Sequence, residues 1–487
     1  MMLSPRRALV WSFAERYASF VISVGGTLVL SRLLTPTQVG IYSLCAAFAA
    51  VAGIVRDFGV SEYLIQEREL TRERLRSAFG IALSVAWALA AALYFSRDAL
   101  AGYFNEPGVA QVLAVMTLHF IILPLSSPAF ALLNREMGFR QLAYLQTACS
   151  LTAAAVTLTL AWRGHGFMSL AWGPIANVTL QTLVLAWLRP RDVFRWPSLA
   201  QAGPVLRYGW MYMSSRVMET LAKNFHEPVI AKRLDFEAVG LFSRAYGMVE
   251  LFHSNVADAV VRVSTPAFAA EHRAGRPLGD VFARATALFV SVSWPFFGFI
   301  ALCSEEIIRV MFGPQWVAAA PIATVLALSA LPGGLHELVP QMLSATGHVH
   351  RRLRLSAWVA PCHIIGVLVA SHWGLLAIAS VSFFSSLVML VLCRQHLHAA
   401  LGMHYRQLLR PSLASAWLAT GVIAAMAGWL WCARTWELPA LAVLVSTLAV
   451  GCALWCGLGR WLRHPAYAEA GAAVRGIMVK ARSMGAA

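Results

Sequence analysis

Charged and polar side chains recur at helical spacing inside long apolar segments of this chain. One set, which shares a single helical face, comprises Arg216, Glu219, Lys223, His226 and Glu227. A second set, near the N-terminus, comprises Ser12, Glu15, Arg16, Ser19 and Ser23. A charged group at mid-bilayer costs at least about 2.5–3.5 kcal/mol, so such groups usually face a water-filled cavity. We therefore predict two helices that each turn a polar face toward a hydrophilic cavity.

The chemistry of these sets favours an anionic ligand. An arginine guanidinium stays charged and binds oxyanions through two parallel hydrogen bonds, which suits a phosphate or pyrophosphate. The candidate substrate-binding residues are Glu15, Arg16, Arg216, Glu219, Lys223 and Arg244. The alternative is that the charges within each set are only ion pairs that hold helices together.

Other titratable residues are candidates for binding a coupling ion. They are His226, Glu227, Glu250, His253 and Asp258. Carboxylates and imidazoles could carry a proton or sodium, and the sequence does not choose between the two gradients. The lone histidines at 119, 336 and 363 are interpreted as hydrogen-bonded structural residues. We predict no bound cofactor.

Enzyme and metal motifs are absent from the sequence. It contains no GxxxxGK[ST] loop and no GxSxG or HExxH pattern, and no segment is long enough for a soluble catalytic domain. The eight cysteines fall in apolar stretches without metal-ligand spacing, so we interpret them as small buried hydrophobic residues. These absences favour a transporter over an enzyme.

The helices that must position these residues follow from the apolar segments. The chain has 487 residues and is 59% hydrophobic and 13% charged, whereas soluble domains carry about 25% charged residues. Segments of about 20 apolar residues are long enough to cross a membrane, and their backbone groups must be satisfied within a helix. We predict an all-α membrane protein with about 14 transmembrane helices. The predicted spans are 9–30, 39–64, 77–96, 109–133, 142–162, 167–188, 208–230, 239–263, 283–303, 317–343, 355–371, 375–393, 411–432 and 438–459.

The basic residues predict the orientation of these helices. The net charge is +16, and the arginines lie mainly in short gaps between apolar segments. If the N-terminus is cytoplasmic, the inside loops and tails hold about 26 Lys and Arg residues and the outside loops about 7. This asymmetry indicates membrane topology rather than a nucleic-acid-binding face, and it places both termini in the cytoplasm.

An internal repeat divides the chain. Residues 31–43 align without gaps on residues 231–243, at an offset of 200 that also places Arg16 on Arg216. An even number of helices per repeat predicts parallel repeats, with the transport site between them. The predicted domains are an N-terminal six-helix bundle at 1–190, a pseudo-symmetric six-helix bundle at 191–400, a C-terminal helix pair at 401–460 and a cytoplasmic tail at 461–487.

An ordered set of short motifs accompanies these helices. They are SRLLTPTQVGIYSL (31–44), RDFGVSEYLIQ (56–66), LLNREMGFRQLA (132–143), VGLFSRAYGMVEL (239–251), IIRVMFGPQWVAAA (307–320) and QMLSATGHVHRR (341–352). Over nearly its whole length the chain resembles the Wzx-like polysaccharide flippases of the multidrug/oligosaccharidyl-lipid/polysaccharide exporter superfamily. The resemblance implies two six-helix bundles plus a terminal helix pair, and alternating access that flips polyprenyl-pyrophosphate-linked oligosaccharides outward. It also implies cationic cavity residues that meet the pyrophosphate, for which Arg16 and Arg216 are the positional matches.

One segment departs from the pattern of that family. Related polysaccharide transporters often read N-A-D-N-x-x-I-G late in the seventh helix, where this chain has residues 224–231. His226 stands where an aspartate is usual, and Ala231 stands where a glycine is usual. An ion-binding role of that aspartate therefore has no counterpart in this chain, unless Glu227 has taken it over.

The resulting prediction is a flippase for an exopolysaccharide, O-antigen or capsule repeat unit in the bacterial inner membrane. The expected partners are the lipid-linked oligosaccharide, membrane lipids, and polysaccharide polymerase and export proteins, without nucleic acid. One alternative keeps the superfamily and changes the cargo to a drug or to the peptidoglycan lipid precursor. Another is a polysaccharide polymerase or ligase, which the short outside loops disfavour.

Overall fold

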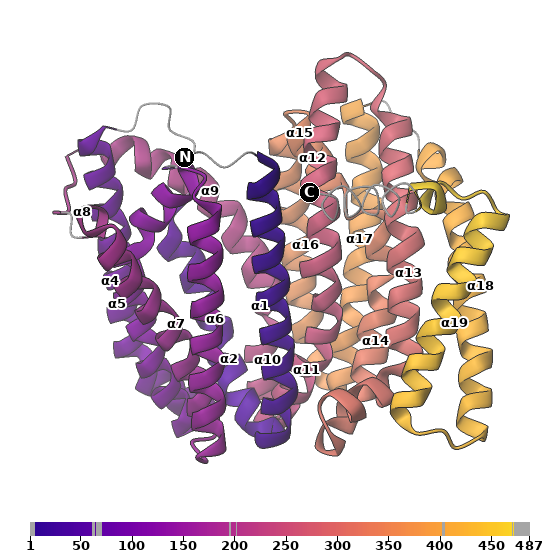
Figure 1. The fold of residues 1–487 in the computed structure, drawn as a ribbon, viewed down its shortest axis with the longest axis horizontal. Helices are drawn as coiled ribbons and strands as arrows, with labels where there is room; N and C mark the ends of the chain where they lie inside the picture. Colours follow the sequence, from indigo (N-terminus) through magenta and orange to yellow (C-terminus); the bar gives the residue numbers. More distant parts are fainter. Residues whose placement is uncertain are drawn as a thin grey trace, which may run out of the picture. The chain divides into compact units, whose positions relative to one another are not determined.

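The computed structural model describes residues 5–60, 64, 71–193, 196–200, 202–401, 405–469 and 471. Within these residues every regular element is a helix (Figure 1). The chain divides into two compact units, Met1–Ser243 (unit 1) and Arg244–Ala487 (unit 2). Parts of the predicted tail and of the 56–66 motif lie outside the described residues.

Unit 1 is a bundle of long helices in which α6 packs along both α1 and α7, and α4 packs along α5. Its elements are α1 (Pro5–Leu33), α2 (Pro36–Asp57), α4 (Arg72–Phe104), α5 (Pro107–Arg135), α6 (Phe139–Trp162), α7 (Phe167–Leu188), α8 (Pro190–Val193), α9 (Ala202–Asn224), α10 (His226–Arg233) and the first turns of α11 (Phe236–Phe252). Both α9 and α10 contact α2, which explains why the unit extends to Ser243. The proposed bundles at 1–190 and 191–400 stay predictions.

Capping residues determine where the helices of unit 1 begin. Thr35 Oγ1 accepts a hydrogen bond from the Gln38 N–H at 3.3 Å, and Gln38 Oε1 accepts one from the Thr35 N–H at 3.2 Å. Two backbone donors that lack helical partners are thereby satisfied. Pro36 occupies the first turn of α2, where its missing N–H costs nothing. The start of α2 is therefore well defined, and it takes part in a close helix contact described below.

Unit 2 is a second helical bundle, in which α13 packs along α18, and α17 packs along α14 and α16. Its elements after α11 are the π-helix η1 (His253–Ala257), α12 (Asp258–Arg273), α13 (Leu278–Met311), the 3₁₀ helix η2 (Pro314–Ala319), α14 (Ala320–Ala330), η3 (Pro332–Leu335), α15 (Val339–Ala345), α16 (Val349–Ala370), η4 (Ser371–Trp373), α17 (Leu375–Leu401), α18 (Tyr405–Thr435) and α19 (Ala440–Trp461). Phe268, Phe282 and Leu338 belong to one of its buried apolar clusters.

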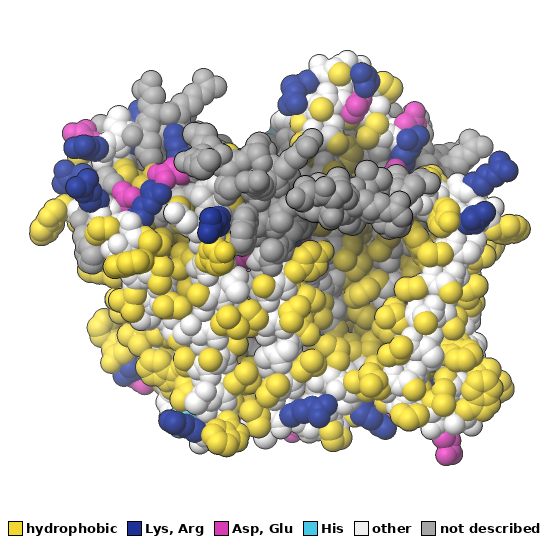
Figure 2. All heavy atoms as spheres, viewed as in Figure 1, with side chains coloured by type: hydrophobic (Ala, Val, Ile, Leu, Met, Phe, Trp, Pro, Cys, Tyr) yellow, Lys and Arg dark blue, Asp and Glu magenta, His cyan; other side chains and the backbone are white. Residues whose placement is uncertain are grey.

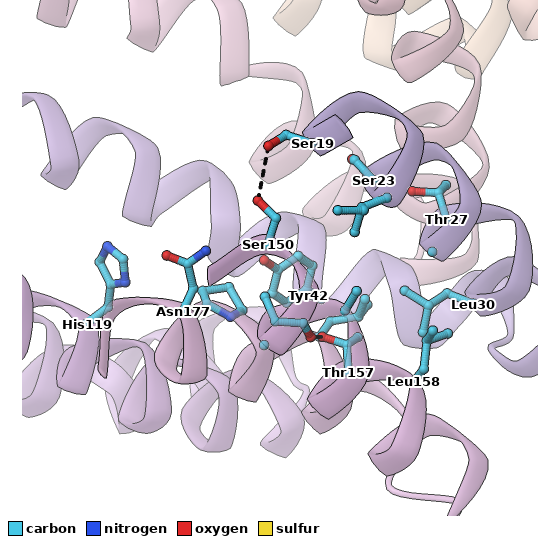
Figure 3. A pocket seen from close by; sticks show the side chains of 17 residues that line it. Ser19, Ser23, Thr27, Leu30, Tyr42, His119, Ser150, Thr157, Leu158 and Asn177 are labelled. Atoms are coloured by element: carbon cyan, nitrogen blue, oxygen red, sulfur yellow. Dashed lines mark hydrogen bonds between the residues drawn. The ribbon is translucent and has the colours of Figure 1, made fainter. Parts of the chain in front are cut away.

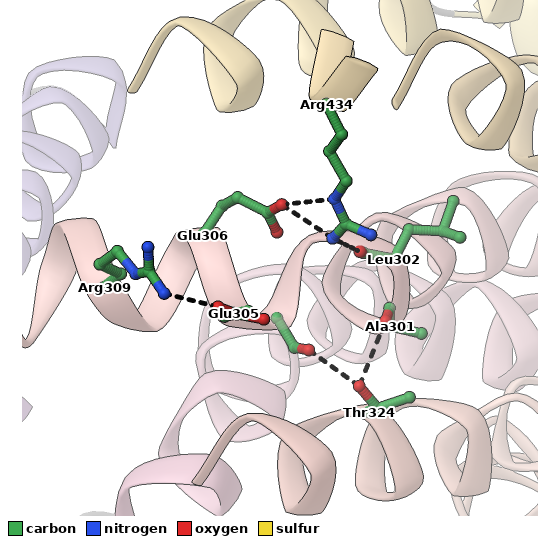
Figure 4. Close-up of polar contacts among 8 residues, drawn as sticks. Ala301, Leu302, Glu305, Glu306, Arg309, Thr324 and Arg434 are labelled. Atoms are coloured by element: carbon green, nitrogen blue, oxygen red, sulfur yellow. Dashed lines mark hydrogen bonds and ion pairs between the residues drawn. The ribbon is translucent and has the colours of Figure 1, made fainter. Parts of the chain in front are cut away.

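A polar network ties α13 to α18 within unit 2 (Figure 4). The backbone of α13 leaves helical geometry at Cys303, with φ −109° and ψ 19°. Just beyond this kink, Glu306 Oε1 accepts a hydrogen bond from Arg434 Nε at 2.8 Å. Arg434 Nη2 also donates to the carbonyl of Leu302 at 3.4 Å. The kink in α13 is therefore the point at which the end of α18 is attached.

All fourteen predicted spans fall on helices in their described parts, which confirms the all-α membrane fold class. Within the described residues, ten helices are long and apolar enough to cross a membrane. Four predicted spans are not among the ten, namely 9–30, 167–188, 208–230 and 239–263. Charged residues lie in three of them, whereas 167–188 contains only neutral polar residues such as Asn177 and Gln181. Figure 2 shows hydrophobic side chains along the visible helix sides, with Lys and Arg gathered toward the helix ends.

A buried histidine anchors the segment that follows α19. Ser415 Oγ donates to the carbonyl of Ala287 at 2.7 Å and lies 3.0 Å from His464 Nε2. His464 Nδ1 accepts from the Ala466 N–H at 3.2 Å, so Nδ1 carries no hydrogen and Nε2–H donates to Ser415. The residue is 3% exposed, and burial lowers the pKa of His464 below its ordinary value.

This histidine should make the protein less stable in mild acid. Because its pKa is lower in the folded than in the unfolded chain, the unfolded chain binds the proton first as the pH falls below about 6.5. We expect the unfolding temperature of the detergent-purified protein to fall between about pH 7.5 and about pH 5.5. Glutamine keeps a donor and an acceptor without titrating, so His464→Gln should reduce this shift. An unchanged shift in that variant would contradict the assignment.

Candidate functional site

The predicted cationic face of α1 lies in unit 1. Glu15 and Arg16 are both half-buried near the middle of this helix. Ser19 and Ser23 continue the same face, and Ser19 Oγ lies 3.4 Å from Ser150 Oγ of α6. The Ser12 side chain lies outside the described residues. The structure therefore places a charged pair next to a row of hydroxyl groups on one helix face.

The second predicted set is divided between two helices of unit 1. Arg216 and Lys223 are exposed on α9, and Glu219 beside them is half-buried. The helix ends at Asn224, and α10 begins at His226, so the predicted span 208–230 is interrupted at Phe225. The exposed cations of α9 and the two titratable residues that follow therefore lie on different helices.

His226 and Glu227 form a buried acid–imidazole pair at the start of α10. His226 Nε2 lies 3.2 Å from Glu227 Oε1, and both residues are at most 9% exposed. The imidazole packs against the Phe242 ring of α11, with 4.5 Å between the centroids. Within the described residues, Glu227 Oε2 is buried without a hydrogen-bond partner. A proton or a cation would compensate this carboxylate, so the pair remains the best predicted site for a coupling ion.

Arg244 lies in unit 2, where aromatic rings hold its guanidinium. The guanidinium carbon is 5.1 Å from the Trp316 ring centroid and 5.6 Å from that of Phe312. Such cation–π contacts stabilise a cation that has left water. Arg244 Nε is buried and has no hydrogen-bond partner in the described part of the chain. The aromatic rings thus stabilise Arg244 inside unit 2. Its predicted contact with substrate stays a prediction.

The remaining ion-coupling candidates lie in unit 2, on the continuous segment formed by α11, η1 and α12. Glu250 is half-buried, Asp258 is exposed, and His253 begins the π-helix η1 with its ring 6.1 Å from that of Phe297. Hydrogen bonds from i to i+5 change the helical period within η1, so α-helical spacing does not continue from Glu250 to Asp258. π-Helical turns occur frequently at functional sites. The ion role of these residues stays a prediction.

The two copies of the sequence repeat meet in space at the α2–α11 crossing, formed by residues 36–43 and 236–243. A Cβ atom added to Gly40 would lie 1.8 Å from the carbonyl oxygen of Phe236, and one added to Gly240 would lie 1.9 Å from that of Pro36. Ser43 Oγ donates to Ser243 Oγ at 3.0 Å. Equivalent residues of the two copies therefore make reciprocal contacts, and both glycines are needed because backbone occupies the space of a side chain.

A cavity of about 410 Å³, with several polar side chains in a mainly apolar lining, lies within unit 1 (Figure 3). It is bounded by α1, α6 and α7, with one residue each from α2 and α5. The residues with polar side chains that line it are Ser19, Ser23, Thr27, Tyr42, His119, Ser150, Thr157 and Asn177. The sequence interpretation missed this cavity, although Ser19 and Ser23 belong to a predicted set, because five separate helices supply the lining.

A second cavity of about 300 Å³ adjoins the first. The two share Tyr42, His119 and Pro174, and the second also contains Arg56, whose guanidinium lies 5.5 Å from the Phe120 ring centroid. His119 thus lines both of these cavities.

The three lone histidines of the sequence differ in their hydrogen bonding. His363 is hydrogen-bonded as predicted, with Nδ1 3.0 Å from Ser385 Oγ. In contrast, His119 Nδ1 and His336 Nε2 are buried without a hydrogen-bond partner among the described residues. His119 nevertheless makes a hydrogen bond to the backbone of Pro174, as the prediction expects, so one nitrogen of its ring is paired and Nδ1 is not.

The helical fold of this chain is that of a known class of membrane transporters. A lipid II flippase, MurJ, in an inward closed conformation superposes with a TM-score of 0.74 over 93% of this chain and 99% of its own, at 11% identity. A multidrug resistance MATE family transporter of the MOP superfamily, in an inward-facing conformation, gives a TM-score of 0.63 over 78% of this chain and 95% of its own, at 13% identity. At such low identities these similarities define the fold alone.

The sequence comparisons identify the family. The family described as "Polysaccharide biosynthesis protein" matches residues 29–321, more than half of the chain. The lipopolysaccharide biosynthesis protein WzxC of Escherichia coli (strain K12) is 22% identical over 71% of this chain and 72% of its own. The succinoglycan biosynthesis transport protein ExoT of Rhizobium meliloti (strain 1021) is 26% identical over 66% of this chain and 65% of its own. The chain belongs to the family of polysaccharide biosynthesis proteins.

Proposed function

We propose that this chain is a flippase that moves a polyprenyl-pyrophosphate-linked oligosaccharide from the cytoplasmic to the outer leaflet of the bacterial inner membrane. Both termini are cytoplasmic in this proposal, as the distribution of basic residues favours. The observation that carries it is the pair of exposed cations, Arg216 and Lys223, on a helix of a polysaccharide biosynthesis family. Exposed arginine in an otherwise apolar protein fits an anionic lipid headgroup.

The cargo class follows from two independent kinds of observation. The relatives are named for lipopolysaccharide and succinoglycan biosynthesis, which supports a sugar polymer precursor. The candidate residues Arg16, Arg216 and Lys223 supply the positive charge that a pyrophosphate requires, and Glu15 and Glu219 are the candidate binding residues beside them on the same helices. His226 and Glu227 are the proposed site at which a proton or sodium ion couples to transport. A polysaccharide polymerase and export proteins would act on the flipped product.

A gene deletion complemented by the chain tests this function. We expect the deletion strain to lose its surface polysaccharide and to accumulate lipid-linked oligosaccharide in the inner leaflet, with both restored by the wild-type chain. Normal polysaccharide together with increased drug sensitivity would instead identify a drug exporter. Accumulation of the peptidoglycan lipid precursor would identify that lipid as the cargo.

A further inference from the structure

A group of basic residues lies where several helices of unit 2 begin or end. Buried apolar side chains of α12, α15, α16 and α17 pack together there, among them Phe268, Met342 and Leu355. This packing holds the helix ends together, and the basic residues on them with it. The basic cluster consists of His272, His348, His350, Arg351, Arg354 and His396.

Short contacts connect members of the basic cluster. Arg351 Nη1 donates to the carbonyl of His396 at 3.3 Å, which joins the start of α16 to the end of α17. The rings of His348 and His350 lie 6.1 Å apart between their centroids. Arg354 is exposed one turn after Arg351, and its charge acts on His396. Basic side chains of α16 and α17 therefore gather at one end of unit 2.

The positive charge of the basic cluster is not balanced within it. In the part of the chain that the structure describes, the charges that act on His348 come from Arg351, His350 and His272, and all of them are basic. Partial burial and these neighbours lower the pKa of His348 below its ordinary value. A bound anion would relieve the repulsion between these groups. The cluster is therefore suited to bind an anion.

A mainly apolar groove between α16 and α17 begins farther along the same two helices. Its volume is about 360 Å³, and its lining includes Cys362 and Gly366 of α16 and Ala377 and Phe384 of α17. Cys362 and Phe384 are exposed, so the groove opens on the surface of the unit. An exposed apolar groove on a membrane protein is suited to contact a hydrocarbon chain.

One face of α16 connects the basic cluster to this groove. Arg354, Trp358 and Cys362 follow one another at intervals of four residues, and side chains with this spacing share a helix face. Arg354 and Cys362 are about 12 Å apart along the helix axis. Half of a bilayer's hydrocarbon core is about 15 Å thick, so an acyl chain attached to a headgroup at Arg354 reaches the groove. Exposed Trp358 lies between the two, and tryptophan is enriched where headgroups meet hydrocarbon.

We propose that the basic cluster and the groove form a binding site for an anionic phospholipid of the surrounding bilayer. The phosphate lies at Arg351 and Arg354, whose guanidinium groups donate to its oxygens, and one acyl chain lies in the groove. The apolar groove favours a lipid over an acidic protein segment, because such a segment has no hydrocarbon chain to place there. The bound lipid stabilises unit 2, since it neutralises the cluster and contacts both α16 and α17. The site is independent of the transported cargo.

Two phospholipids with the same acyl chains, phosphatidylglycerol and phosphatidylcholine, test this site on the purified full-length protein in a neutral detergent. We expect phosphatidylglycerol to bind about tenfold more tightly and to raise the unfolding temperature more. Arg354→Gln should weaken binding of phosphatidylglycerol by about fivefold, because each arginine near an anionic lipid contributes about that factor. This variant leaves the hydrogen bond between Arg351 and α17 intact. Arg460→Gln is the matched control, because Arg460 is an exposed arginine of unit 2 at the end of α19, and it should bind both lipids as the wild type does.

Phosphatidylglycerol with a photoreactive group in its acyl chain locates that chain. We expect cross-links to peptides that contain Cys362 or Ala377, and Ala377→Phe should reduce them because the ring fills the groove. Equal affinity of the wild type for both phospholipids would overturn the proposal, as would the same loss in Arg460→Gln as in Arg354→Gln. Displacement of phosphatidylglycerol by a soluble polyglutamate peptide, with cross-links outside the groove, would overturn it in favour of an acidic protein partner. Tighter binding of undecaprenyl pyrophosphate at the same residues would assign the cluster to the cargo instead.

Discussion

Replacing Gly240 with alanine is expected to reduce transport by about tenfold, because the new methyl group collides with backbone at the α2–α11 crossing. Its Cβ would lie 1.9 Å from the carbonyl oxygen of Pro36, and the reciprocal variant Gly40→Ala would place a Cβ 1.8 Å from that of Phe236. Backbone carbonyls cannot rotate away as a flexible side chain can. Overpacking of this kind costs about 1–3 kcal/mol, which changes a conformational equilibrium about 5- to 150-fold.

Cross-linking across the α2–α11 crossing measures this effect directly. Ser43 Oγ and Ser243 Oγ are 3.0 Å apart, so cysteines at both positions should form a disulfide on oxidation. We expect Gly240→Ala to decrease both the yield of this disulfide and the export of polysaccharide. Gly247→Ala is the matched control on α11, because a Cβ at that position meets no atom within 4 Å. Unchanged cross-linking in Gly240→Ala would show that the two helix starts need not approach so closely.

Arg16→Ala and Arg216→Ala are expected to abolish most transport while the protein still inserts in the membrane. Each variant removes a guanidinium that binds the pyrophosphate, and hydrogen bonds to a charged group contribute about 1.5–3 kcal/mol each. The expected decrease in affinity for undecaprenyl pyrophosphate is thus about 10- to 100-fold. Lysine retains the charge and loses the planar pair of donors, so Arg16→Lys should recover only part of the affinity.

The control for these variants is an exposed arginine outside the predicted sets. Arg163 caps the C-terminal end of α6 and is exposed, so Arg163→Ala changes the net charge equally. We expect it to leave lipid binding and surface polysaccharide unchanged. Normal polysaccharide in both Arg16→Ala and Arg216→Ala would refute the assignment of the headgroup site. A comparable loss in Arg163→Ala would indicate that general electrostatic attraction to the membrane, rather than a specific contact, is measured.

The sequence alone determined the helical membrane fold and the positions of its spans. These properties are local, because each apolar segment must match the bilayer thickness and satisfy its own backbone. The sequence also revealed the repeat of residues 31–43 in residues 231–243, which contains Gly40 and Gly240, since a repeat is visible without coordinates. Helical spacing placed Arg16, Ser19 and Ser23 on one face of α1, and this assignment needs only the period of the helix.

Only the tertiary structure decided how the predicted residues are used. The interruption at Phe225 and the π-helix at His253 change which residues share a face, and such breaks depend on packing rather than on composition. Arg244 lies against Trp316, about seventy residues away in the sequence, so no local pattern could reveal that contact. The cavity around His119 requires five helices at once. Long-range packing decides which side chains are buried and which polar atoms stay unpaired, so these properties could not be predicted from the sequence.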